Sequence, residues 1–117
     1  MTNTEIIRQV NEGFASGDSD RILAHVADDV RWEIMGISTH VGRDEFAREI
    51  NNENFEGLPV IVITGETEEG DRVAVEGTVE ARFRGGAPLH LYFHNAYRLE
   101  NGKIKEMRSY LVENNGK

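Results

Sequence analysis

The stretch from residue 87 to residue 112 constrains the fold most strongly, because it holds two long strand patterns around a turn signal. Asn101 and Gly102 form that signal, since both central residues of a type I′ hairpin turn need a positive φ angle. Before the turn, one face of the alternating pattern is mostly apolar and comprises Leu89, Leu91, Phe93, Asn95, Tyr97 and Leu99. An isolated hairpin is marginally stable in water, so this one must bury a face against the rest of the chain.

The strand pattern after the turn alternates in the same way. It places Met107, Ser109 and Leu111 on one face of the strand. The opposite face is mixed in character and comprises Ile104, Glu106, Arg108, Tyr110 and Val112. The two runs together predict a long antiparallel pair with one face more apolar than the other.

Three helical segments precede these strands. Thr2 and Glu5 fit a capping box, and apolar residues then recur at helical spacing until Gly17 stops the helix. A cap at residues 18–19 starts a second, shorter helix. A third helix opens with Gly42 as its N-cap and ends in polar residues.

The remaining segments are strand-like. A short strand is expected over residues 30–35, with residues 27–29 as the end of the preceding helix and residues 36–40 as a loop. After the third helix, β-branched or alternating runs at 60–64 and 73–83 lead into the hairpin.

Gly77 interrupts the middle of the strand at 73–83, which suggests a bulge or a sharp bend of the kind that a curled sheet needs. Helices come early in the chain and an antiparallel meander follows. This order predicts an α+β fold in a single domain over residues 1–117, with the helices gathered on one face of the sheet.

The composition narrows the classes of function. A net charge of −8 argues against nucleic acid and anionic membrane surfaces as partners. The chain has no cysteine, which excludes disulfides, a thiolate nucleophile and a thiolate metal site. No apolar run could span a bilayer and the N-terminus lacks the order of a signal peptide, so we expect a cytoplasmic protein.

At this point the sequence resembles a known family. The chain is similar over nearly its whole length to the NTF2-like superfamily, in particular to its SnoaL-like and ketosteroid-isomerase-like members. The residues that carry the resemblance are Gly17-Asp18, the segments 27–32, 41–46 and 97–104, and Tyr110.

The resemblance implies a cone-shaped, strongly curved sheet wrapped around a long helix. It also implies a pocket between the helices and the concave face, and a homodimer through the convex face. It does not determine a function, because the superfamily includes isomerases, cyclases, hydrolases, dehydratases and proteins without catalysis.

In such a cone the more apolar faces should line a pocket for a small apolar molecule. The expected ligand-binding residues are Phe14, Trp32, Ile34, Phe55, Leu91, Phe93, Asn95, Tyr97, Met107, Ser109 and Leu111. A mostly apolar wall with a few polar groups is typical of a small-molecule site. We expect neither a cofactor nor a metal ion.

The catalytic residues of ketosteroid isomerases have no counterpart here. The resemblance places the base near Ile34, the oxyanion-stabilising tyrosine near Val10 and the protonated acid near Leu91. None of these side chains ionises, which argues against steroid isomerisation. SnoaL-type cyclases also use acid–base residues, and His40 is the one candidate for that role. The alternative for His40 is a surface or hydrogen-bonded loop histidine.

Two pocket residues have both a structural and a functional interpretation. Trp32 could be a core residue whose indole N–H finds a partner, or a ligand contact. Asn95 is an amide on an apolar face, so it needs a ligand, a water molecule or Ser109 across the hairpin as a partner.

His90 and His94 share one strand face with Tyr92 between them. Two histidines need a third ligand to hold a metal, and the HExxH pattern is absent. The mixture of aromatic and charged groups on this predicted convex face, including Tyr110, suits a subunit interface better.

Two functions therefore stay open from the sequence. The first is a SnoaL-like cavity protein that binds a small apolar molecule, with the possibility of isomerase or cyclase activity in which His40 is the acid or base. The second is a non-catalytic, dimeric ligand-binding or accessory domain.

Overall fold

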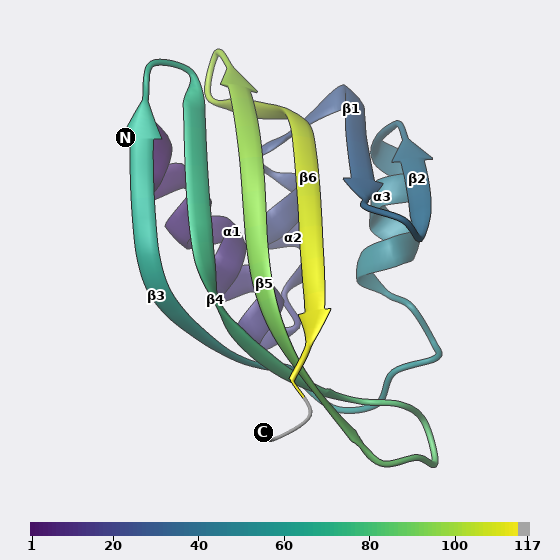
Figure 1. Ribbon diagram of the computed structural model, residues 1–117. Coiled ribbons are helices and arrows are strands. Elements are labelled where there is room, and N and C mark those ends of the chain that lie inside the picture. The colour runs from purple at the N-terminus through teal and green to yellow at the C-terminus, as the bar shows by residue number, and fades with distance from the viewer. Residues whose placement is uncertain (115–117) are drawn as a thin grey trace.

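The computed structural model describes residues 1–114 and has an α+β architecture, as predicted. Its helices are α1 (Asn3–Ser16), α2 (Ser19–Leu23) and α3 (Arg43–Ile50). Its strands are β1 (Val26–Ile34), β2 (Ser38–Val41), β3 (Val60–Glu69), β4 (Arg72–Arg82), β5 (Pro88–Glu100) and β6 (Lys103–Glu113). Figure 1 shows the curved sheet in front, with α1 and α2 behind strands β3 to β6 and with α3 beside β1 and β2.

The six strands form one sheet in the order β2-β1-β6-β5-β4-β3. All neighbouring pairs are antiparallel except β1 and β6, which are parallel. The predicted hairpin is the β5–β6 pair, in which Asn95 faces Ser109. Asn101 and Gly102 turn it with φ angles of 53° and 76°, which confirms the predicted turn.

At Gly77, strands β3 and β4 lie too close together for a side chain. The register shifts between Ile63 and Gly65 on β3, opposite Gly77, so the extra residue of the predicted bulge lies on the neighbouring strand. A Cβ atom on Gly77 would lie 1.9 Å from the Val62 carbonyl oxygen. Only glycine therefore permits this approach.

Helix α1 begins and ends as the sequence predicts. The Thr2 hydroxyl accepts a hydrogen bond from the Glu5 N–H at 3.1 Å, and Glu5 Oε1 accepts one from the Thr2 N–H at 3.1 Å. Gly17 ends the helix in the left-handed conformation, with φ 70°. None of the helices among residues 1–114 is long and apolar enough to cross a membrane.

Two predicted boundaries are wrong around the first strand. Residues 27–29 belong to β1, which begins at Val26, because Val26 pairs with Ile104 of β6. Residues 38–40 lie in β2 and not in a loop, because they pair with β1, with His40 opposite Trp32. A four-residue strand is too short to reveal itself by alternation, so only its pairing partner identifies it.

The predicted face of Ile104 is also wrong. The β5–β6 register shifts between Arg98 and Leu99, where the next pair after Arg98–Glu106 is Leu99–Ile104. The extra residue, Lys105, reverses the alternation, and Ile104 is fully buried. The core between the helices and the concave face contains, among others, Ile7, Val10, Phe46, Val73, Tyr97 and Ile104.

Candidate functional site

A mostly apolar cavity of about 240 Å³ opens between the helices and the concave face of the sheet, and we call it the chamber. Helix α1 contributes Asn11 and Phe14, and helix α3 contributes Glu49. The other residues that line it come from the sheet and from the approach to β3: Trp32, Ile34, Pro59, Ile61, Val79, Phe93, Asn95, Met107, Ser109 and Leu111.

The chamber gathers most of the residues that the sequence singles out. Those that line it are Phe14, Trp32, Ile34, Phe93, Asn95, Met107, Ser109 and Leu111. Tyr97 is buried in the core and outside the lining, with 2% of its surface exposed. Leu91 is half-buried outside the lining. Phe55 stacks on Phe83 at a ring-centroid distance of 5.0 Å, in a groove next to the chamber.

Trp32 is both a core residue and a wall of the chamber. Its indole N–H donates to the Ser109 hydroxyl oxygen at 2.9 Å, in a buried hydrogen bond. Its ring packs against Phe46 at a centroid distance of 4.7 Å and edge-on against Phe14 at 6.2 Å. These contacts hold the ring in one orientation at the side of the cavity.

Three buried polar atoms near the chamber have no hydrogen-bond partner among the described residues. They are Asn11 Nδ2, Asn95 Oδ1 and the Tyr97 hydroxyl. Burial raises the pKa of Tyr97, and a side-chain interaction with Asn95 acts in the opposite direction. A buried polar group without a partner costs about 1–3 kcal/mol, so the two asparagine atoms, whose side chains line the chamber, are available to a ligand or to water.

His40 does not line the chamber, but it contacts Glu49, which does. His40 Nε2 lies 3.0 Å from the Ser38 hydroxyl oxygen and 3.5 Å from Glu49 Oε2. Its ring packs beside Trp32 at a centroid distance of 6.0 Å. The side chains of His40 and Glu49 are 20% and 23% exposed, so both lie at the rim.

Asn11 and Glu49 are polar residues of the chamber that were not predicted from the sequence. Their positions in the helices contain a signal, because Asn11 follows Ile7 by four residues and Glu49 follows Phe46 by three. Residues with these spacings share a helix face with the buried position. A pattern of apolar residues does not reveal them, because both side chains are polar.

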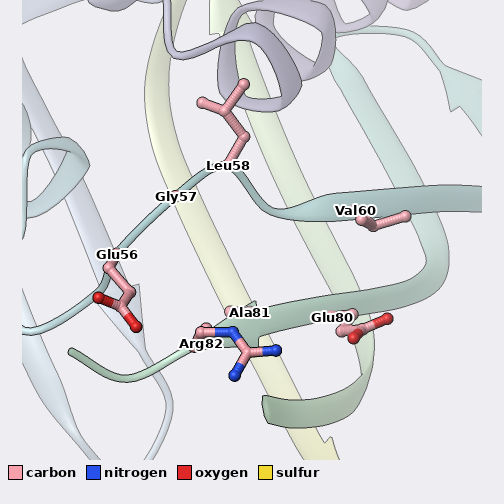
Figure 2. Close-up of a pocket in the computed structure, with 7 residues that line it drawn as sticks. All are labelled: Glu56, Gly57, Leu58, Val60, Glu80, Ala81 and Arg82. Atoms are coloured by element: carbon pink, nitrogen blue, oxygen red, sulfur yellow. The ribbon is translucent and has the colours of Figure 1, made fainter. Parts of the chain in front are cut away.

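Two grooves with charged residues in their linings adjoin or lie near the chamber. One shares Phe14, Glu49 and Pro59 with it and is otherwise lined by residues such as Glu53 and Arg84; we call it the vestibule. The other, drawn in Figure 2, runs along the ends of β3 and β4. Glu80, Arg82 and Leu58 are among the residues that line it, and the Leu58 side chain extends away from those of Glu80 and Arg82. It contains none of the predicted site residues.

His90 and His94 lie on the sheet face opposite the chamber. His94 approaches Tyr110 edge-on, at a ring-centroid distance of 6.2 Å. Among residues 1–114, no group of three or more histidine, aspartate and glutamate side chains could hold a metal ion.

The fold and the position of the chamber define an NTF2-like protein, in which helices cover a curved sheet and a cavity lies between them. The model of the SnoaL-like domain family matches residues 7–107. The chain therefore belongs to the SnoaL-like domain family of the NTF2-like superfamily. No curated protein matches the sequence.

Solved structures share this fold at low sequence identity. An NTF2-like protein of unknown function from Burkholderia pseudomallei K96243 is 24% identical, with a TM-score of 0.85, over 96% of this chain and 92% of that one. An LEH-like epoxide hydrolase from M. tuberculosis is 18% identical, with a TM-score of 0.84, over 94% and 82%. TerC, co-crystallised with polyporic acid, is 25% identical, with a TM-score of 0.79, over 96% and 91%.

Proposed function

We propose that this protein binds a small, mostly apolar molecule in the chamber. The observation that carries this proposal is the pair of amide side chains, Asn11 and Asn95, that line an otherwise apolar cavity and each hold a buried atom without a partner. A ligand group that both donates and accepts hydrogen bonds would satisfy them. The apolar wall would cover the rest of the molecule.

The size of the chamber limits the ligand. A dry cavity of about 150 Å³ accommodates benzene, so about 240 Å³ corresponds to a somewhat larger ring or a short chain. TerC, which shares the fold, has been crystallised with polyporic acid, which supports a small-molecule role for this architecture.

Binding is a better-supported function than isomerase or cyclase catalysis. His40, the predicted acid or base, stands behind Glu49 and does not line the chamber. Among the described residues, Glu49 is the only ionisable side chain in the lining. A catalytic role would need this carboxylate to exchange a proton with the ligand, and the orphan amides would only orient that ligand.

We also propose a homodimer through the convex face of the sheet. Val62, Thr78, Tyr92 and Val112 form a continuous row across four strands, since each is the register partner of the next. Tyr92 and Val112 are 50% and 62% exposed. An apolar row with His90, His94 and Tyr110 beside it has the aromatic and apolar character of a subunit contact.

Native mass spectrometry followed by denaturing release tests the binding proposal, because it reads the oligomeric mass and the bound molecule together. Binding of added ligands can be followed by fluorescence of Trp32, the one tryptophan in the chain. Val79→Phe fills the chamber and should abolish binding, whereas Val60→Phe adds the same bulk at an exposed position outside it. Equal binding by both variants would exclude the chamber as the site.

A further inference from the structure

Glu49 lies where the chamber meets two neighbouring grooves. Glu49 lines the chamber, the vestibule and a third groove that runs along α3 past His40. It is the one residue that all three share. A molecule that enters the chamber from the vestibule must therefore pass this side chain.

No permanent cation pairs with Glu49 among the described residues. Its one ion-pair contact is His40 Nε2 at 3.5 Å, and an imidazole is positively charged only when protonated. Arg84, across the vestibule, donates from Nε to the Glu53 carbonyl at 2.8 Å. Arg82 directs Nη1 towards the Gly86 carbonyl at 3.5 Å. Both arginines are therefore engaged with backbone oxygens.

Charged residues of both signs line the grooves beside Glu49, and none of them forms an ion pair with it among the described residues. The charged residues of the groove along α3 and of the vestibule are Glu45, Arg48, Glu53, Glu56, Arg82 and Arg84. The rest of the chamber wall is mostly apolar, with Phe14 and Ile61 among its members. A carboxylate at such a rim is partly desolvated, and a charge-assisted hydrogen bond from a ligand cation would stabilise it.

We propose that the chamber is selective for small organic amines. The apolar part of the amine lies against Phe14, Phe93 and their neighbours, and its ammonium group donates to the Glu49 carboxylate at the rim. This inference rests on the proposed binding function and adds the chemical class of the ligand. His40 and the amine are then alternative partners of one carboxylate.

The shared carboxylate links binding to pH. In binding measurements between pH 8 and pH 5, any protonation of His40 places a positive charge 3.5 Å from Glu49 Oε2, and the two groups pair. The ammonium group must then displace that pair, so the preference for an amine weakens as the pH falls. The amine itself keeps its charge over this range, since alkylammonium groups titrate near pH 10.

The test compares cyclohexylamine with cyclohexanol, two probes of similar shape that differ in charge. Binding to the intact protein is measured by calorimetry and by Trp32 fluorescence. At pH 8 the wild type should bind the amine about tenfold more tightly than the alcohol. Glu49→Gln should remove this preference without preventing alcohol binding. Glu53→Gln, which removes a carboxylate of the vestibule outside the chamber, should keep it.

The pH series tests the role of His40. At pH 5.5 the tenfold preference should shrink in the wild type and persist in His40→Asn. Equal binding of amine and alcohol by the wild type at pH 8 would overturn the amine proposal and leave the binding function intact. If neither probe binds, both the amine proposal and the proposed binding function are overturned. A preference that survives Glu49→Gln would contradict the role of this carboxylate.

Discussion

The Ser109 hydroxyl accepts the indole N–H of Trp32 at 2.9 Å, across the parallel β1–β6 pair. The hydrogen bond pairs the buried indole N–H of Trp32. Its acceptor, Ser109, is the register partner of Asn95 in the β5–β6 hairpin. Asn95 Oδ1, across the hairpin from Ser109, has no hydrogen-bond partner among the described residues.

Ser109→Ala should lower the free energy of unfolding by about 1–3 kcal/mol, because it leaves the buried indole N–H unpaired. Urea unfolding followed by circular dichroism measures this change. Ser16→Ala removes the hydroxyl of an exposed side chain–backbone hydrogen bond in α1 and should change stability by less than about 0.5 kcal/mol. Equal effects of the two substitutions would contradict a structural role for the Trp32–Ser109 bond.

Asn95→Leu should raise the free energy of unfolding by about 1 kcal/mol in the absence of ligand. The substitution removes a buried acceptor that has no partner and keeps a similar side-chain volume. Chemical denaturation of ligand-free protein provides the measurement. A loss of stability instead would show that the amide is already satisfied in the folded protein. The same variant should bind polar ligands of the chamber more weakly.

Tyr97 should make the fold sensitive to alkaline pH. Burial raises the pKa of Tyr97 in the folded state above the value of about 10 that an unfolded tyrosine has. The folded state therefore holds this proton more tightly, so its stabilising effect is complete below pH 10 and is lost as the pH rises beyond 10. Unfolding measured from pH 8 to 11 should show a steeper loss in the wild type than in Tyr97→Phe. Parallel curves would contradict this assignment.

The proposed dimer predicts a specific mutant phenotype. Tyr92→Glu places a charge in the middle of the exposed row and should shift the protein from dimer to monomer, as measured by sedimentation or light scattering at several concentrations. Ile37→Glu introduces the same charge at an exposed apolar position in the β1–β2 turn and should leave the dimer intact. A monomeric wild type at high concentration would reject the interface.

Structural features that depend only on residues close together in the sequence could be predicted from it. The capping box of Thr2 and Glu5, the stop at Gly17 and the turn at Asn101-Gly102 were predictable, because each follows from a backbone conformation or a hydrogen bond within a few residues. The two-residue period of β5 likewise placed Phe93, Asn95 and Tyr97 on one face. Together with the family resemblance, these signals were sufficient to predict the α+β fold.

Features that depend on a partner distant in sequence were not predictable. The short β2 strand exists because β1 lies beside it, and the burial of Ile104 depends on an extra residue, Lys105, in the pairing with β5. One added residue reverses every later side chain, and no local pattern records it.

The sequence by itself thus determined the class of fold, the main strand faces and most of the apolar wall of the chamber. Only the tertiary structure decided which polar groups meet there. It brought Asn11 and Glu49 from two helices to the chamber and set His40 behind Glu49. The physical reason is that hydrophobic periodicity encodes burial, whereas the pairing of polar atoms depends on distances between elements that the chain packs together only on folding.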